Sequence, residues 1–295
     1  MKIIEPSVVL WEQKDNISHV ARCARICYGK ETGDDNKTYQ RLLNSKHWSM
    51  FRHQSVYAIL DYDYAVFEVL IMFAECPYIE YKTENNKLYI STNYNFILYL
   101  KENSEQSNIY SKLYGIIINN EVSAEVFENT EIGFNMMRYT FCVVTQISTS
   151  RELNRVSPNN IAERSTRYVY EDRTICRPHW MTKEEAYYFS NEPILKEYVD
   201  SDEHKKAYRY YNSCNNAFIN YEKLIDSYGF SKQDARGVLP LDTATKCIYT
   251  YSIYEWRKII DLRFYGTTGV PHPNAKIIAG MIRETLIELG YDFRI

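Results

Sequence analysis

Residues 134–147 read FNMMRYTFCVVTQI, and residues 148–170 continue as STSRELNRVSPNNIAERSTRYVY. The first stretch is strongly apolar, and it predicts a buried central strand over Asn135–Thr145. The second stretch is polar and carries four arginines within seventeen residues, namely Arg151, Arg155, Arg164 and Arg167. The chain therefore leaves its core on a segment rich in groups that bind anions.

Arginine is the residue that best suits phosphate and carboxylate oxygens, because it stays charged and presents a planar fork of donors. Hydroxyl and amide side chains between the arginines add directional contacts to the same oxygens. On a helix, Arg151 and Arg155 would share one face, and on an extended segment Ser165 and Arg167 would share one. The competing interpretation is a solvated surface with weak salt bridges.

Composition limits the classes of protein that the chain can belong to. The 295 residues contain no linker rich in Gly, Ser or Pro, so one domain over residues 1–295 is predicted. A net charge of −3 argues against a nucleic-acid binder. Seven cysteines without a CxxC pair favour a reducing, cytoplasmic location. The longest apolar stretch, Ala65–Ala74, is too short for a membrane helix, which needs about 18 residues.

The hydrophobic pattern predicts an α/β (α+β) fold, with a central sheet flanked by helices and a helical C-terminal half. Strands are expected, besides the central one, over Ile3–Trp11 and Gln54–Asp61, with a hairpin formed by Ile79–Lys82 and Lys87–Ser91. Helices are expected over His19–Tyr28, Thr38–Lys46, Asn95–Leu100, Ile109–Asn119, His204–Tyr228, Gln233–Ile253, Glu255–Phe264 and Ala275–Leu289.

The sequence lacks the motifs of several common classes of binding site and catalytic site. Neither GxGxxG nor a Walker glycine loop occurs, and no GxSxG elbow is found. His47 and His53 are six residues apart, which is a poor metal spacing, so no metal site is predicted. A second group of arginines stands far from the first: Arg236 lies near a predicted helix start, and Arg263 ends a helical turn. Taken alone, the position of each of these two favours a structural role over a functional one.

Taken together, these segments resemble the flavin-dependent thymidylate synthases. The resemblance covers most of the chain except residues 61–133, which are expected to hold a family-variable insertion. It is carried by seven segments: KIIEPSV (2–8), HWSMFRH (47–53), RELNRVSPNNIAERSTRY (151–168), RPHW (177–180), ARGVLPLDTATK (235–246), EWRKIIDLRF (255–264) and HPNAK (272–276). It implies methylation of deoxyuridylate (dUMP) at C5, with a methylene group from methylenetetrahydrofolate, FADH2 as reductant and NADPH to reload the flavin. It also implies a homotetramer with active sites shared between subunits.

The resemblance assigns roles to individual residues. The implied dUMP contacts are Arg151, Glu152, Arg155, Glu163, Arg164, Ser165, Thr166, Arg167, Arg236 and Arg263. Among them Ser165 and Arg263 are the implied catalytic residues, with Arg167 on the phosphate and Arg263 favouring the N3-deprotonated pyrimidine. The implied FAD contacts are His47, Ser49, Arg155, Val156, Ser157, Glu163, Ser252, Tyr254 and Lys258.

The flavin part of this pattern departs from the family. The signature Arg-His-Arg is here Arg155-Val156-Ser157, and Arg52 stands where the family has glutamate. Two lost charge-assisted contacts would cost roughly 3 to 6 kcal/mol of cofactor affinity, unless residues such as Arg52 or Arg173 replace them. Three hypotheses follow: a working enzyme with a rebuilt flavin site, a diverged pyrimidine-nucleotide enzyme with altered flavin or one-carbon chemistry, and a non-catalytic dUMP-binding homologue.

Overall fold

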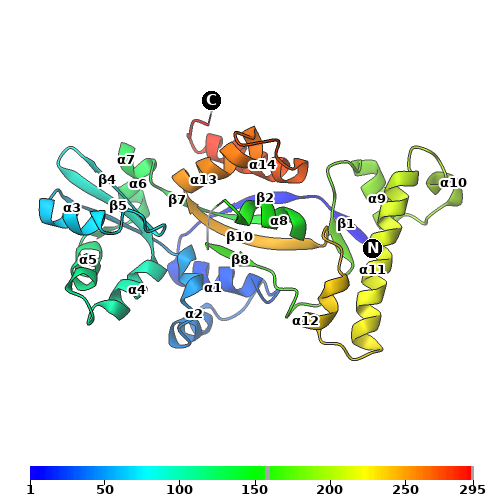
Figure 1. The fold of residues 1–295 in the computed structure, drawn as a ribbon, viewed down its shortest axis with the longest axis horizontal. Coiled ribbons are helices and arrows are strands. Elements are labelled where there is room, and N and C mark those ends of the chain that lie inside the picture. Colours follow the sequence, from blue (N-terminus) through cyan, green and yellow to red (C-terminus); the bar gives the residue numbers. More distant parts are fainter. Residues whose placement is uncertain (157–159, 294–295) are drawn as a thin grey trace.

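The computed structural model describes residues 1–156 and 160–293, which form a mixed assembly of helices and sheets (Figure 1). The strands are β1 (Lys2–Ile4), β2 (Ser7–Trp11), β3 (Ser55–Asp61), β4 (Ile79–Glu84), β5 (Lys87–Asn93), β6 (Glu121–Val122), β7 (Arg138–Gln146), β8 (Ile161–Glu163), β9 (Thr174–Cys176) and β10 (Ala244–Ser252). The prediction of a mixed α/β fold with helices flanking sheet is confirmed.

Helices connect these strands. The α-helices are α1 (Asn16–Ile26), α2 (Asp35–Asn44), α3 (Tyr64–Ile71), α4 (Tyr94–Asn103), α5 (Asn108–Asn119), α6 (Ala124–Glu128), α7 (Glu131–Phe134), α8 (Ile147–Asn154), α9 (Lys183–Asn191), α10 (Lys196–Val199), α11 (Lys205–Asp226), α12 (Lys232–Ala235), α13 (Ile253–Ile260) and α14 (Pro273–Glu288). Two 3-10 segments, η1 (Trp48–His53) and η2 (Arg236–Val238), and a π-helical turn, η3 (Asp261–Tyr265), complete them. Over the described residues, no helix combines the length and the apolar character that crossing a membrane requires.

The central sheet has the strand order β2-β7-β10-β8, and all its pairs are antiparallel. The predicted strand over Asn135–Thr145 is its β7. The prediction of a helix over Gln233–Ile253 is wrong, because β10 occupies the second half of that range. Alternate residues of β10 face opposite sides of the sheet: Tyr249 and Tyr251 pack in one apolar cluster, and Ile248 packs in another.

Helices cover both faces of the central sheet. In Figure 1, α13 and α14 lie on one side and α1 and α2 on the other. The first cluster buries Trp256, Ile278 and other residues of α13 and α14, together with Leu153 of α8. The second cluster packs α1, α2 and η1 against the sheet. Burial on both faces makes β7 and β10 the rigid support from which α8 and α13 start.

A second sheet has the order β4-β5-β3-β6 and lies at the opposite end of the molecule from α11 (Figure 1). The predicted hairpin is its β4 and β5, and Asn85 and Asn86 adopt the positive φ values of 48° and 58° that a tight turn requires. Most of this sheet comes from residues 61–133. That this range is an insertion, within one domain over residues 1–295, stays a prediction.

The expected strand over Ile3–Trp11 is in fact two strands that join different sheets. Proline has no N–H to donate, and Pro6 separates β1 from β2. β1 pairs in parallel with β9, and β2 pairs with β7 at the edge of the central sheet. Both strands keep the apolar residues that suggested one strand, so the mistake concerns continuity only.

Candidate functional site

The polar segment that follows β7 begins with α8, whose start is fixed by Gln146. This side chain is 1% exposed, accepts a hydrogen bond from Thr149 Oγ1 at 2.8 Å, and donates to the carbonyl oxygen of Arg177 at 3.0 Å. Because Gln146 is the last residue of β7, these bonds fix the direction in which α8 leaves the sheet. Arg151 lies within α8, but Arg155 follows the last helical residue.

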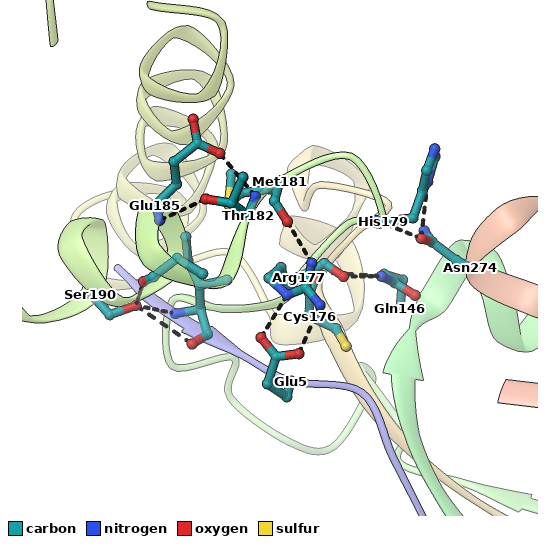
Figure 2. Close-up of polar contacts among 12 residues, drawn as sticks. Glu5, Gln146, Cys176, Arg177, His179, Met181, Thr182, Glu185, Ser190 and Asn274 are labelled. Carbon is teal, nitrogen blue, oxygen red and sulfur yellow. Dashed lines mark hydrogen bonds and ion pairs between the residues drawn. The ribbon is translucent and has the colours of Figure 1, made fainter. Parts of the chain in front are cut away.

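Residues 176–182 form the framework behind that helix start (Figure 2). Arg177 bonds both carboxylate oxygens of Glu5, at 2.6 and 2.9 Å, and also donates to the carbonyl oxygen of Met181. The next turn is tied to α14, because Asn274 Oδ1 accepts from the backbone N–H of His179 at 2.8 Å. The RPHW segment therefore has a structural role that joins β1, β7 and α14.

The loop after β8 is a turn, so the extended arrangement in which Ser165 and Arg167 would share one face does not occur. The N–H of Val169 donates to the carbonyl oxygen of Ser165 at 3.0 Å, which curls the backbone. The N–H of Ser165 in turn donates to the carbonyl oxygen of Cys27 at 3.1 Å, and that of Arg164 to Lys246 at 2.9 Å. The loop is thus pinned between the end of α1 and β10.

A cavity of about 540 Å³ opens where this loop, α8 and η2 meet; we call it the arginine cavity. It brings together six residues of the predicted nucleotide site, which come from three separate segments: Arg151, Glu163, Arg164, Ser165, Thr166 and Arg236. Ile147, Ser150, Gly237, Leu239, Pro240 and Leu241 complete its lining. Its size lies in the range of small-molecule sites.

The charged side chains around the arginine cavity differ in their hydrogen-bond and ion-pair partners. Arg151 is exposed, and its side chain makes no ion pair or hydrogen bond with the residues described. Arg236 donates to Thr166 Oγ1 at 3.3 Å. Glu163 Oε1 accepts from Ser150 Oγ at 2.9 Å and from Thr245 Oγ1 at 3.1 Å, which fixes the one carboxylate of the wall. The cavity therefore combines unneutralised cationic donors with oriented hydroxyls.

Arg164 is held from behind by Glu171. The two form an ion pair at 3.2 Å, and Arg164 also donates to the carbonyl oxygen of Tyr170 at 3.3 Å. Glu171 is only 2% exposed, and this burial raises the pKa of its carboxyl to about 7, although the Arg164 charge opposes the shift. Glu171 therefore changes charge near neutral pH, directly beside an arginine of the cavity.

Three residues of the predicted nucleotide site form a separate cluster. Arg263 donates from Nε to the carbonyl oxygen of Glu152 at 2.9 Å and pairs with its carboxylate at 3.5 Å. Arg155 approaches the same carboxylate at 3.8 Å. Arg263 lies in the π-helical turn η3 that follows α13. Within one chain, Glu152 thus holds Arg155 and Arg263 outside the lining of the arginine cavity.

Arg167 also lies outside that lining. Its Nε donates to Gln233 Oε1 at 2.8 Å, and its guanidinium lies 5.4 Å from the ring centre of Tyr168. The side chain of Tyr168 in turn packs against Tyr28 with ring centres 5.4 Å apart. A basic and aromatic surface therefore continues from the mouth of the cavity toward α12.

A second cavity, of about 590 Å³, gathers four of the predicted flavin residues: Val156, Ser252, Tyr254 and Lys258. It lies where the central sheet meets the second sheet, and we call it the junction cavity. The segment 74–81 of this chain completes its lining, together with Arg138 and Glu255. Lys258 lies 4.3 Å from the ring centre of Tyr254.

The remaining predicted flavin residues are elsewhere or outside the described part. His47 and Ser49 belong to the η1 region and do not line the junction cavity, and Ser157 lies outside the described residues. Glu163 faces the arginine cavity. The segment of α8 and the residues just after it border both cavities, because Arg151 lines the arginine cavity and Val156, two residues past the helix end, lines the junction cavity.

Sequence reasoning missed several residues of these walls. Ser150 stands in the quoted polar stretch, but Thr245 belongs to the segment that was mistaken for helix. Arg138 and Glu80 carry no motif, and only the packing of the central sheet against the second sheet brings them both to the junction cavity. Among residues 1–156 and 160–293, no three side chains of the metal-binding kinds are grouped closely enough to hold an ion.

Comparison with known proteins assigns the family. The family model described as thymidylate synthase complementing protein matches residues 92–286. No curated protein sequence matches the chain. Among solved structures, the UMP/dUMP methylase PolB from Streptomyces cacaoi, bound with 5-Br dUMP, has 17% identity and a TM-score of 0.43 over 98% of this chain and 93% of that one. Thymidylate synthase X from Helicobacter pylori, with FAD and dUMP, has 15% identity and a TM-score of 0.36 over 58% and 72%. The match to the family model spans well over half of the sequence and confirms the resemblance predicted above: the chain belongs to the thymidylate synthase complementing protein family.

Proposed function

We propose that the protein binds dUMP in the arginine cavity and methylates it at C5, with methylenetetrahydrofolate as the carbon donor. The observation that carries the proposal is the convergence of Arg151, Arg164 and Arg236 with the hydroxyls of Ser165 and Thr166 on one cavity. The family resemblance independently implies a nucleotide contact for each of these residues.

The chemistry of dUMP suits this wall. Its phosphate is a dianion, and charge-assisted hydrogen bonds from arginine are among the strongest contacts that such a group can make. Arg151 and Arg236 have donors free to turn toward a phosphate, since the partner of Arg236 is a neutral hydroxyl. The hydroxyl of Ser150 and that of Thr245 orient Glu163 at the same wall, where its carboxylate can accept a hydrogen bond from the ligand.

The junction cavity is the proposed flavin site. Tyr78, Tyr81 and Tyr254 offer flat apolar surfaces for a planar ring, and Lys258 offers a cation. The buried polar atoms Arg138 Nε and Glu80 Oε2 have no partner among the described residues, so the wall has hydrogen-bonding capacity for a heteroaromatic ligand. When bound, FAD would supply the reducing electrons, with NADPH reloading it. The chain's own part is to hold the ring, exclude water and keep dUMP next to it.

A homotetramer is part of the proposal. Apolar side chains stay exposed near the arginine cavity and beyond it: Leu241 is 60% exposed and Val270 fully exposed. The resemblance implies sites shared between subunits, so Arg167 and Arg263, which lie apart from the cavity in one chain, can still belong to one assembled site.

The proposal is tested by titrating dUMP into the protein in a calorimeter and by assaying conversion of dUMP to thymidylate with FAD, NADPH and methylenetetrahydrofolate. Arg236→Ala should lower dUMP affinity by about one to two decades, because one charge-assisted contact contributes about 1.5 to 3 kcal/mol. A wild-type protein that does not bind dUMP would overturn the proposal.

One observation favours a second candidate, a nucleotide enzyme with altered flavin or one-carbon chemistry. Val156 lines the junction cavity where the family has histidine, so an apolar surface replaces a donor. The visible spectrum of the purified protein, followed by product analysis, distinguishes the two. A flavin spectrum with thymidylate as product supports the first candidate, and a flavin spectrum with another product supports the second.

A further inference from the structure

Arg138 is a buried arginine to which neither motif nor family resemblance gives a role. It is the first residue of β7, pairs with Ser252 of β10, and its side chain is only 3% exposed. It lines the junction cavity and, on its other side, a larger cavity of about 880 Å³. A charged group is seldom kept at such a position without a partner, because its desolvation is costly.

The partners of Arg138 leave part of its guanidinium unsatisfied. One terminal nitrogen donates to the carbonyl oxygen of Thr250 at 3.3 Å, and the other lies 3.9 Å from a carboxylate oxygen of Glu255. Its backbone N–H donates to the hydroxyl of Tyr57 at 3.0 Å, which fixes the start of the strand. Nε of Arg138 is buried and has no partner among the described residues. One directional donor of this cavity-lining residue therefore has no hydrogen bond within the part of the chain described.

Glu80 supplies the complementary acceptor in the same wall. It lies on β4 opposite Ser91 of β5, which is itself opposite Tyr57 of β3, so the three side chains share one face of the second sheet. That face is turned toward Arg138, as the Tyr57 contact shows. Glu80 Oε1 lies 3.9 Å from Lys82 Nζ, whereas Oε2 is buried without a partner in the part of the chain described.

An unsatisfied donor and an unsatisfied acceptor in one wall select a particular ligand edge. Each buried polar group left without a hydrogen bond costs about 1 to 3 kcal/mol, so a ligand that bonds to both groups binds more tightly by relieving both costs. The matching edge has a carbonyl oxygen beside an N–H, which is the imide edge shared by uracil and by the flavin ring. The arginine cavity already provides for the nucleotide, and the aromatic lining of the junction cavity suits the larger flavin ring.

We propose that Arg138 and Glu80 bind the imide edge of the flavin ring, with Arg138 Nε donating to a ring carbonyl and Glu80 Oε2 accepting from the adjacent ring N–H. The inference rests on the proposed function only in taking FAD as the cofactor. It gives this chain its own replacement for the donors lost at Val156 and Ser157, and it draws that replacement from β4 and β7 rather than from the signature segment.

The test measures binding, not turnover. FAD is titrated into flavin-free protein and followed by quenching of its fluorescence, for wild type, Arg138→Met, Arg138→Lys and Glu80→Gln. Lys82→Met is the matched control, because Lys82 is a cation beside Glu80 that does not line the junction cavity. A parallel titration uses FAD methylated at ring N3, which lacks the imide N–H but keeps the rest of the cofactor.

Arg138→Met is expected to weaken FAD binding at least tenfold, Arg138→Lys to recover part of this loss, and Lys82→Met to leave it unchanged. Wild type should bind FAD at least tenfold more tightly than the N3-methylated analogue, and Glu80→Gln should reduce that preference. Glu80→Gln keeps the side-chain volume and should therefore fold. It tests binding of the flavin imide edge even if Arg138→Met fails to fold. The affinity of all variants for dUMP should stay within about twofold of wild type.

Equal binding of FAD and its N3-methylated analogue by wild type would overturn the inference and leave the proposed function standing. So would variants that lose dUMP affinity and keep FAD affinity, since the edge bound would then be that of uracil. A wild-type protein that takes up no FAD would overturn the flavin part of the proposed function, and this inference with it.

Discussion

Replacing Arg151 by alanine separates ligand binding from stability more cleanly than any other change in the arginine cavity. Arg151 is exposed and lies on α8, and its side chain has neither an ion pair nor a hydrogen bond among the residues described. Its removal leaves no buried partner unsatisfied, and alanine favours the helix. The free energy of unfolding should therefore change by less than about 0.5 kcal/mol.

The affinity for dUMP should change far more. A charge-assisted hydrogen bond to a phosphate contributes about 1.5 to 3 kcal/mol, so the dissociation constant of Arg151→Ala should rise by roughly 10- to 150-fold. Calorimetric titration measures this constant, and a urea melt checks stability. Arg41→Ala is the control, because Arg41 is an exposed helical arginine on α2, remote from the cavity lining.

The loss of affinity should also depend on salt. Raising ionic strength screens exposed charges, so the difference between wild type and Arg151→Ala should shrink between 0.05 and 0.5 M salt, as the Debye length falls below about 10 Å. If Arg151→Ala binds dUMP as tightly as the Arg41→Ala control at low salt, the arginine cavity is not the phosphate site.

Three further predictions concern other parts of the molecule. Burial raises the pKa of Glu171 to about 7, so between about pH 4.5 and 7 the folded state holds a proton there that the unfolded state releases. The free energy of unfolding should therefore fall by about 3 kcal/mol in all as pH rises through this range. Glu171→Gln should flatten this pH dependence in urea melts at pH 5 and 8. Thr245→Val removes one of the two hydroxyls that orient Glu163 and should weaken dUMP binding about threefold to tenfold in calorimetry, whereas unchanged binding would mean that Glu163 does not meet the ligand. Light scattering should give a mass near four times 35.0 kDa, and a monomer that turns over dUMP would refute the shared site.

The sequence predicted the parts of the fold that depend on local pattern. The apolar run before Ser148 is β7, and the stripe in residues 204–228 is α11 (Lys205–Asp226). The sequence-based prediction of a helix was wrong for β10. Residues 243–250 contain both alternating and consecutive apolar residues, a pattern that suits either a helix or a strand buried on both faces. Only its pairing along the whole of β7 decides between them.

For the candidate site, the sequence predicted only those residues that lie within the recognised motifs. The segment 163–166 and Arg236 meet in one cavity although seventy residues separate them, an arrangement that resemblance implied and spacing alone could not. Arg138 and Glu80 were beyond prediction, because their proximity depends on how two sheets pack. For Arg263 the resemblance and the single chain disagree. The resemblance implies a contact with dUMP, but within one chain Arg263 bonds to Glu152 and does not line the arginine cavity.

The proposed function requires that dUMP is bound in the arginine cavity and converted there to thymidylate. The most direct measurement is single-turnover conversion of labelled dUMP by the purified protein with FAD, NADPH and methylenetetrahydrofolate, compared between wild type and Arg236→Ala. We expect wild type to form thymidylate only when FAD is present, and Arg236→Ala to need at least tenfold more dUMP for the same yield. Equal yields from both proteins would show that Arg236 and the arginine cavity do not bind the substrate. No thymidylate from a wild type that is folded and saturated with flavin would show that the protein does not methylate dUMP.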